Sequence, residues 1–202
     1  MKRAERQKAV EESLMRVGLP KDYLDKFPLS IGGGEKQLVC VARALAANHS
    51  FIVLDEPTSA LDVSIQAKIT NKLIELQKAS NLSYLFITHN LCLVRNMCDR
   101  LGIMYLGKIV EEANTIDFFK NPLHPYTKML LASIPVISDE EDALKPQKIH
   151  STGEIPSPLN KPAGCSFHPR CPFKTKQCEC EVPEKREVHP GHTVACHNFD
   201  KI

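Results

Sequence analysis

Residues 51–62, FIVLDEPTSALD, constrain the fold of this chain more than any other stretch. Four apolar residues lead into two acids, which is the pattern of a buried parallel strand with polar side chains at its carboxyl end. Successive side chains of a strand point in opposite directions, so Asp55 and Glu56 are expected to have different roles. Asp55 suits the shell of a Mg²⁺ ion, usually through water. Glu56 suits a general base that polarises an attacking water, although two acids at a strand end are also a common structural arrangement.

Apolar patterns on both sides of this strand predict an α/β fold. The first residues carry helix-compatible charges, and apolar stripes with helical spacing run through residues 38–45 and 65–76. Residues 82–88, LSYLFIT, form a second short apolar run and are predicted to be another buried strand. Strand, helix and strand in this order make a βαβ unit with a right-handed crossover. Residues 101–112 are expected to form a hairpin that turns at residues 106–107.

Composition limits the classes of function. With 43% hydrophobic and 25% charged residues, the chain is expected to be a globular protein rather than a disordered one. The formal net charge of +2 and the lack of an Arg/Lys stripe give no reason to expect a nucleic-acid partner. No apolar run approaches the roughly 20 residues that span a bilayer, and the charged N-terminus lacks the apolar core of a secretory signal. The chain is therefore expected in the cytosol, where any contact with a membrane would run through a partner.

A glycine cluster precedes the first long amphipathic stripe. In IGGGEKQ, residues 31–37, the glycines open a predicted helix and so present backbone N–H groups and the positive end of the helix dipole to an anion. The 202 residues contain no G-x-x-x-x-G-K-[ST] sequence, the loop whose N–H groups and lysine cradle the phosphates of a nucleotide. On its own, the chain is therefore not expected to bind ATP tightly.

The acidic strand end is similar to the Walker B motif and D-loop of ABC ATPases, and the rest of the chain follows that family's order. The resemblance implies an α/β fold, a partial P-loop NTPase domain of the kind that hydrolyses ATP with Mg²⁺. It implies that Asp55 organises Mg²⁺ and that Glu56 activates water. Residues 59–62, ending in Asp62, correspond to the D-loop, which crosses the dimer interface, and the resemblance implies that Asp62 lies at the nucleotide. His89, in FITHNL, matches the switch histidine that contacts the γ-phosphate and the attacking water.

The glycine cluster aligns without gaps to the ABC signature, usually written LSGGQ or LSGGEKQ. The residues that match are Gly33, Gly34, Glu35, Lys36 and Gln37, of which the resemblance implies that Gly33, Gly34 and Gln37 lie at the nucleotide, together with Gly32. Ile31 replaces the leucine, and Gly32 replaces a serine that, in the family, donates a hydroxyl to the γ-phosphate of ATP held by the opposite subunit. A charge-assisted hydrogen bond of that kind contributes roughly 1.5–3 kcal/mol, so the half-site with Gly32 is expected to be weakened. Ser30 could substitute only if the loop changed register.

The family resemblance covers nearly the whole chain but not a complete nucleotide-binding domain. The P-loop and the glutamine-containing loop that senses the transporter have no counterpart, so the chain is expected to start inside the helical subdomain. It would then be a fragment, a gene remnant, or one polypeptide of a site that a second polypeptide completes. The expected organisation is a C-terminal portion of the nucleotide-binding domain at residues 1–115 and a Cys-rich extension at residues 116–202.

The tail narrows the resemblance to one branch of the family. Residues 124–135, HPYTKMLLASIP, resemble the C-terminal extension of oligopeptide and dipeptide ABC importers, and residues 135–162 read as a proline-rich linker or arm. Five cysteines crowd into the last 38 residues. In a cytosolic chain such a cluster favours a metal site over disulfides. The spacing of four of them suits a tetrahedral Zn²⁺ or an iron–sulfur cluster: Cys165, Cys171, Cys178 and Cys196.

Some members of this branch carry a [4Fe–4S] cluster at that cysteine pattern, to which Cys180 does not belong. Two other arrangements stay open: the four thiols carry no metal, or tail histidines replace some of them as ligands. The histidines concerned are His168, His189, His192 and His197.

The resemblance implies an ATPase subunit that couples ATP hydrolysis to the uptake of di- or oligopeptides or of related solutes such as nickel chelates. Its expected partners are a second ABC ATPase subunit, integral-membrane permease subunits and, indirectly, an extracytoplasmic solute-binding protein. The expected location is the cytoplasmic face of the cell membrane. Two alternatives remain: a non-catalytic regulatory or binding module that does not turn over ATP alone, and a soluble ABC protein outside transport.

Overall fold

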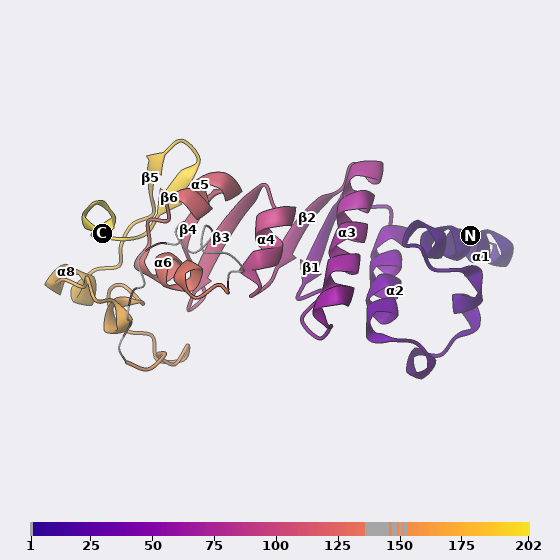
Figure 1. Cartoon of the computed structure of the whole chain (residues 1–202), viewed down its shortest axis with the longest axis horizontal. Helices are drawn as coiled ribbons and strands as arrows, with labels where there is room; N and C mark the ends of the chain where they lie inside the picture. Colours follow the sequence, from indigo (N-terminus) through magenta and orange to yellow (C-terminus); the bar gives the residue numbers. More distant parts are fainter. Residues whose placement is uncertain (1, 136–145, 147–148, 150, 152) are drawn as a thin grey trace. The chain divides into compact units, whose positions relative to one another are not determined.

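The computed structural model describes residues 2–135, 146, 149, 151 and 153–202 (Figure 1). The chain divides into two compact units, Met1–Leu93 and Val94–Ile202, each of which is described by itself. In the described residues, no helix is both long enough and apolar enough to cross a membrane. Half of the predicted proline-rich arm, residues 136–145, 147–148, 150 and 152, lies outside the described residues.

The first unit begins with a pair of packed helices. Their bounds, with those of two short 3-10 turns between them, are α1 Arg3–Arg16, η1 Lys21–Asp25, η2 Pro28–Ser30 and α2 Gly33–Ala46. The apolar stripe predicted for α2 is confirmed, because Val41, Ala42 and Leu45 are its buried residues. Helix α1 packs against α2 and contributes the buried Leu14.

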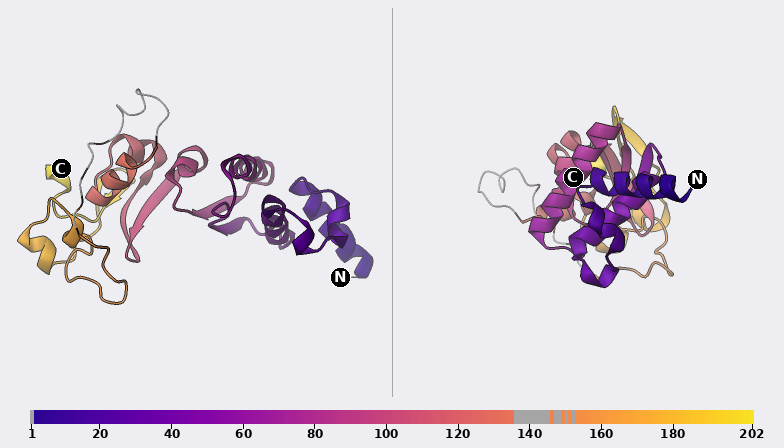
Figure 2. Two further views of the ribbon diagram at one scale, coloured as in Figure 1. Left: turned by 60° about the horizontal axis from the view of Figure 1, so that its bottom comes forward. Right: turned by 90° about the vertical axis from the view of Figure 1, so that its right-hand side faces the viewer.

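A βαβ unit follows and confirms the prediction from the sequence. It consists of strand β1 (Phe51–Asp55), helix α3 (Val63–Ser80) and strand β2 (Ser83–Ile87). The strands are parallel, with Ile52 opposite Tyr84. The Tyr84 hydroxyl donates to the Leu73 carbonyl of α3 at 3.2 Å, so this face of the sheet is the one that α3 covers (Figure 2).

The other face of the β1–β2 sheet corrects one expectation. Both strands were expected to be buried, yet four apolar side chains are substantially exposed: Phe51 (55%), Val53 (53%), Leu85 (48%) and Ile87 (44%). The four belong to one face, since Val53 pairs with Leu85 in the register. A parallel strand reads as a continuous apolar run because it is normally covered on both faces. Among the described residues of the first unit, only the α3 face has such a cover.

The second unit is built on an antiparallel sheet of order β3-β4-β6-β5. The predicted hairpin is confirmed as β3 (Arg100–Tyr105) and β4 (Lys108–Asn114). Strands β5 (Arg186–His189) and β6 (His192–Val194) come from the tail, and β6 pairs with β4. The helical elements are α4 Leu91–Met97, which spans the boundary between the units, α5 Thr115–Lys120, α6 Pro125–Ala132, η3 His168–Arg170, α8 Lys176–Cys180 and η4 Phe199–Lys201.

The two compact units do not divide where the sequence suggested a domain boundary. The proposed limit at residues 115–116 separates β4 from the tail, whereas β4 pairs directly with β6. The boundary at 115–116 rests on which family motifs each segment resembles, whereas the two compact units rest on contacts between residues. The two divisions therefore describe different properties. The boundary at 115–116 stays a prediction.

A buried carboxylate joins the tail to the rest of the second unit. Glu111, on β4, is 0% exposed. Its Oε1 accepts from the backbone N–H of Leu123 at 2.7 Å and faces Nε2 of His192 at 2.8 Å, while its Oε2 accepts from the N–H of His124 at 2.8 Å. Burying a carboxylate without partners would be costly, so these contacts fix β4, the start of α6 and β6 together.

The His-Pro-Tyr sequence at residues 124–126 is explained by its contacts at the start of α6. His124 is the N-cap of α6 and accepts from the N–H of Tyr126 through Nδ1 at 3.0 Å. Burial lowers the pKa of His124 to about 3, so the ring is neutral and can accept. The Tyr126 ring packs on Tyr105 and Phe167, with centroids 4.7 Å and 5.5 Å away.

Candidate functional site

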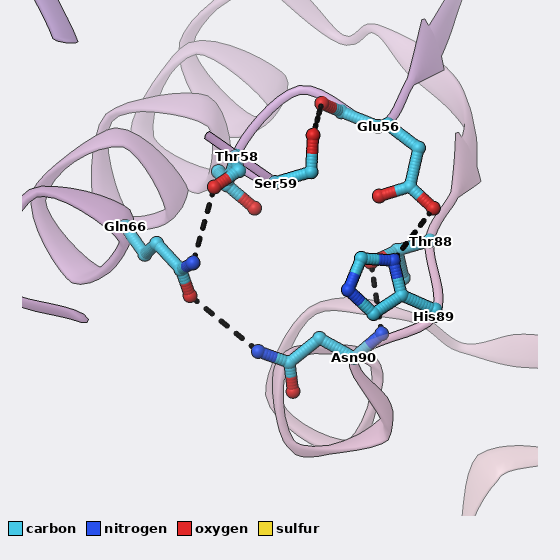
Figure 3. Close-up of polar contacts among 7 residues, drawn as sticks. All are labelled: Glu56, Thr58, Ser59, Gln66, Thr88, His89 and Asn90. Atoms are coloured by element: carbon cyan, nitrogen blue, oxygen red, sulfur yellow. Dashed lines mark hydrogen bonds and ion pairs between the residues drawn. The ribbon is translucent and has the colours of Figure 1, made fainter. Parts of the chain in front are cut away.

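Glu56 and His89 meet at one edge of the β1–β2 sheet (Figure 3). Because the strands are parallel, their carboxyl ends lie side by side, with Asp55 opposite Ile87. The N–H of Glu56 donates to the carbonyl of Ile87 at 2.9 Å and holds the residue after β1 at this edge. The Nδ1 atom of His89 lies 2.9 Å from Oε1 of Glu56. The two residues to which the motifs assigned catalytic roles are therefore in direct contact.

The backbone and the carboxylate of Glu56 both have features typical of functional positions. Its φ angle of 46° lies in the left-handed region, which costs a residue other than glycine about 1–3 kcal/mol. Oε2 is shielded from solvent and has no hydrogen-bond partner in the described part of the chain. A carboxylate only accepts hydrogen bonds, so Nδ1 of His89 must carry the proton where it faces Oε1. Oε2 is thus a buried acceptor that is left unpaired among the described residues.

The two aspartates of this region have different surroundings. Asp55 is exposed at the carboxyl end of β1, where its carboxylate is open to a cation. Asp62 is the N-cap of α3: Oδ1 accepts from the Ser64 hydroxyl at 2.7 Å and from the N–H of Ile65 at 2.9 Å. These two bonds, that of Ser64 first, lower the pKa of Asp62. Asp62 thus has a capping role that the motif did not reveal, and its predicted role at the nucleotide stays a prediction.

Two signature glycines are required by close packing. Gly33 and Gly34 form the first turn of α2, as the sequence indicated. A β-carbon at Gly34 would lie 2.5 Å from Cγ2 of Ile65, and one at Gly33 would lie 3.0 Å from Cδ2 of Leu61. Helix α2 therefore begins directly against the D-loop and the first turn of α3. Spacing along the chain could not reveal this contact.

The N–H group of Gly32, which was expected to be open to an anion, is already occupied. It donates to Oε2 of Glu35 at 2.8 Å, and Oε1 of Glu35 accepts the hydroxyl of Tyr23. The Tyr23 hydroxyl and the Gly32 N–H lower the pKa of Glu35, which in turn raises the pKa of Tyr23. The hydroxyl of Ser30 donates to the carbonyl of Phe27 at 2.8 Å. Ser30 is thus bonded locally rather than standing in for the missing signature serine.

Two glutamines lie near the motifs. Gln37, which the sequence assigned to the nucleotide site, is half-buried on α2, and that role stays a prediction. Gln66, which the sequence did not single out, donates through Nε2 to the carbonyls of Thr58 and Leu61 in the D-loop region, at 3.1 Å and 3.0 Å. Its Oε1 accepts from Nδ2 of Asn90, 3.4 Å away. The only local signal was a polar residue beside the apolar stripe of α3.

The four cysteines of the predicted metal site come together in the second unit. Cys178 is buried, the other three are half-buried, and all four are free thiols. Burial raises the pKa of Cys171 to about 11 and that of Cys196 to about 12, and neighbouring cysteines of the set contribute to both shifts. Within the described residues, however, no group of three or more His, Cys, Asp or Glu side chains is arranged to hold a metal ion. Metal or cluster binding therefore stays a prediction.

The tail histidines mostly have other contacts, which weakens their case as alternative ligands. Nitrogen atoms of three of them face oxygen atoms 2.8–3.0 Å away: His192 faces the Glu111 carboxylate, His168 the Cys165 carbonyl and His197 the Glu181 carbonyl. His189 is exposed at the end of β5. Cys180 is exposed at the end of α8, apart from the buried Cys178.

Two family profiles match the chain. That of ABC transporters matches residues 2–59, and that of the C-terminal region of oligopeptide/dipeptide transporters matches residues 110–178. The oligopeptide transport ATP-binding protein AppF of Bacillus subtilis (strain 168) is 48% identical over 96% of this chain and 59% of its own length. Over most of its length the chain is similar to the oligopeptide/dipeptide family of ABC transporter ATP-binding proteins. The predicted resemblance is thus confirmed.

A second ABC relative gives the same picture. The di/tripeptide transport ATP-binding protein DppF of Pseudomonas aeruginosa (strain UCBPP-PA14) is 42% identical over 100% of this chain and 61% of its own length. The chain therefore spans about three fifths of the length of these curated ABC relatives.

Solved ABC cassettes share the fold. The ADP conformation of the ATP-binding cassette MJ1267 is 29% identical with a TM-score of 0.54, over 60% of this chain and 49% of that one. The cbiO1 protein of Clostridium perfringens, part of an ABC transporter complex, is 28% identical with a TM-score of 0.52, over 59% of this chain and 47% of that one. The ABC ATPase fold is confirmed, and the Cys-rich extension as a metal-binding region stays a prediction.

Proposed function

We propose that this chain is part of the ATPase subunit of an ABC importer, which couples ATP hydrolysis to the uptake of dipeptides, oligopeptides or related solutes. The observation that carries the proposal is the 2.9 Å contact between Glu56 and His89, beside the exposed Asp55. A carboxylate that a histidine holds in place is suited to polarise a water. The relatives, named as ATP-binding proteins of oligopeptide and di/tripeptide transport, supply the solute class.

Each residue of this edge has its own task in the proposed hydrolysis. Asp55 would hold Mg²⁺ through water, and the bound ion supplies positive charge against the phosphates. The Nδ1–H of His89 fixes the Glu56 carboxylate, which would accept a hydrogen bond, and then a proton, from the attacking water. The start of α2, at Gly33 and Gly34, presents N–H groups to a nucleotide held by a second ATPase subunit.

The test uses a chimaeric subunit in which this chain replaces the matching segment of Bacillus subtilis AppF. Glu56→Gln keeps the size and the hydrogen bond to His89 but removes the base. It should lower ATP hydrolysis by about 10²–10⁴-fold while nucleotide binding persists. Hydrolysis within about threefold of the unmodified chimaera would remove Glu56 from the role of base. If the chain were a non-catalytic module, which the relatives do not favour, the unmodified chimaera would already be unable to hydrolyse ATP.

The proposed partners follow from the same assignment. A second ABC ATPase subunit would face the signature and D-loop region, and integral-membrane permeases would hold both subunits at the cytoplasmic face of the membrane. A solute-binding protein would act indirectly, through the permeases. The test is uptake of a labelled peptide by cells whose peptide importer carries the chimaera: uptake that depends on Glu56 supports the assignment, and an active ATPase without uptake contradicts it.

For the tail we propose an iron–sulfur cluster held by Cys165, Cys171, Cys178 and Cys196. The four thiols are close enough for Cys165, Cys171 and Cys178 each to raise the pKa of Cys196. They are not arranged around a single ion, and one Zn²⁺ would need all four sulfurs about 2.3 Å from its centre. A cluster of several irons spreads its ligands more widely and so fits this set better. When bound, the cluster would stabilise the fold of a segment that has only a small apolar core.

Metal analysis after anaerobic purification tests the cluster. Iron and sulfide in the unmodified chain, lost in Cys165→Ser and retained in the matched variant Cys180→Ser, are expected. Stoichiometric zinc would replace the cluster by a single-ion site. If neither metal co-purifies and Cys165→Ser leaves the tail equally resistant to protease, the site does not exist.

A further inference from the structure

Gln66 uses its whole side-chain amide to connect two separate parts of the site (Figure 3). It lies in the first turn of α3, and both hydrogens of its Nε2 are donated, to the carbonyls of Thr58 and Leu61 at 3.1 Å and 3.0 Å. Its Oε1 accepts from Nδ2 of Asn90 at 3.4 Å. Thr58 directly precedes the D-loop and Leu61 belongs to it, whereas Asn90 directly follows His89.

These contacts close a ring around the site. The ring runs from the D-loop through Gln66 to Asn90, along the backbone to His89, and across the 2.9 Å contact to Glu56. It returns to the D-loop because the Ser59 hydroxyl donates to the carbonyl of Glu56 at 3.2 Å. On the far side, the N–H of Asn90 donates to the Thr88 hydroxyl at 3.1 Å, which fixes the backbone on both sides of His89.

The ring connects two segments that belong to no helix or strand. The D-loop lies between β1 and α3, and residues 88–90 lie between β2 and α4. Neither segment belongs to a sheet or helix, so side-chain hydrogen bonds help to fix its backbone, together with turn bonds such as that from the N–H of Leu61 to the carbonyl of Thr58. Gln66 bonds to both segments. Because it is a neutral amide with fixed donor and acceptor ends, it transmits position rather than charge.

We propose that Gln66 is a positioning residue through which the D-loop sets the orientation of His89 toward Glu56. The inference deepens the proposed function, on which its link to ATP hydrolysis rests. A partner subunit that displaces the D-loop would move the carbonyls of Thr58 and Leu61, and Gln66 and Asn90 would pass that displacement to His89. The water-activating pair would then be aligned only while the D-loop is in place.

The first test needs no hydrolysis and uses the 202-residue chain itself. The imidazole ¹⁵N shifts of His89 report which ring nitrogen carries the proton, measured at a pH near 8, where an ordinary imidazole is neutral. The unmodified chain should show the Nδ1–H form, since Glu56 accepts from Nδ1. Gln66→Leu should shift the signal toward a mixture of both forms. An unchanged His89 signal in a folded Gln66→Leu chain overturns the proposal.

Two further variants separate positioning from support of the fold. Asn90→Ala cuts the ring between Gln66 and His89 but leaves both bonds to the D-loop, so it should reproduce the His89 change. Gln77→Leu makes the same substitution near the other end of α3 and should leave the His89 signal unchanged. If Gln77→Leu alters His89 as much as Gln66→Leu does, or if Asn90→Ala does not alter it, the ring is not the route.

The second test measures turnover in the chimaeric subunit. Gln66→Leu should lower kcat by about 10- to 100-fold with KM for ATP unchanged, because a misplacement of about 1 Å costs up to that factor while binding groups stay in place. A parallel rise in KM, or an equal fall in Gln77→Leu, would indicate a general loss of structure and overturn the proposal. Loss of the proposed ATPase function would appear separately, as an inactive unmodified chimaera with an intact His89 signal.

Discussion

Replacing Gly164 by alanine is expected to undock the cysteine-rich tail. Gly164 is buried and has a φ of +65°, in the left-handed region that glycine adopts without strain. A β-carbon there would lie 2.4 Å from the carbonyl oxygen of Cys178 and 2.8 Å from the carbonyl carbon of Glu179. Both are backbone atoms, which cannot turn aside as a side chain can. The clash falls beside the 2.8 Å hydrogen bond from the N–H of Cys165 to the same Cys178 carbonyl.

The magnitude can be isolated with a matched control. Gly191 has a similar φ of +74°, but a β-carbon at that position would meet nothing within 4 Å, so Gly191→Ala tests the backbone strain alone, about 1–2 kcal/mol. Gly164→Ala adds overpacking of about 1–3 kcal/mol. Alanine also lowers the conformational entropy of the unfolded chain relative to glycine. This effect is common to both variants and cancels when their stabilities are compared. The expected difference is therefore about 1–3 kcal/mol.

Pulsed alkylation read out by mass spectrometry measures this difference at one site. Cys178 is 6% exposed, so its thiol reacts only when the tail opens. Its labelling rate should be about 5- to 150-fold higher in Gly164→Ala than in Gly191→Ala, the rate ratio that corresponds to about 1–3 kcal/mol. The exposed Cys180 should react equally fast in both chains. Equal protection of Cys178 in the two variants would refute the role of Gly164.

Three further predictions concern the start of α2. Gly34→Ala should lower the free energy of unfolding by about 1–3 kcal/mol because of its 2.5 Å approach to Ile65, and Ile65→Ala should reduce that loss in a double-mutant cycle; purely additive effects would contradict this. The lowered pKa of Glu35 means that its cap stabilises the fold above the ordinary carboxyl pKa and is lost as the pH falls through the folded value. In urea unfolding, the stability difference between the native chain and Glu35→Gln should therefore be present at neutral pH and vanish in acid; a difference that is constant with pH would argue against the charge. Gly32→Ser should raise steady-state hydrolysis by the chimaeric subunit, and unchanged or lower turnover would mean that the loop uses another donor.

Local patterns were sufficient for the parts of the fold that depend on neighbouring residues. The run at 51–54 and the one at 82–88 predicted β1 and β2, and their parallel order placed Glu56 and His89 at a common edge. The contact between these two residues follows from topology once both strands are assigned. The sequence did not predict that Val53 and Leu85 are exposed. An apolar run shows that both faces of a strand are suited to burial, but it does not show whether both faces are covered.

Long-range polar contacts could not be derived from the sequence. Gln66 looked like an ordinary surface residue of a helix start, and Asp62 was assigned to the D-loop; only the fold shows that Gln66 bonds to Asn90 and that Asp62 caps α3. Glu111 reads as an exposed strand residue beside Glu112, yet it is fully buried. Such a carboxylate is tolerated only because distant parts of the chain supply its hydrogen-bond partners. The periodicity of a sequence gives no information about partners at that separation.

The distance between Glu111 and His192 has a consequence for synthesis of the chain. The two residues are 81 positions apart. At about 5–20 residues per second, His192 is made roughly 4–16 s after Glu111. During that interval the nascent β3–β4 hairpin carries a carboxylate that lacks one of its partners, and β4 has an unpaired edge where β6 will add. The second unit thus completes its fold only when its last residues have been translated, and a ribosome that stalls before them leaves the edge of β4 open to the wrong strand.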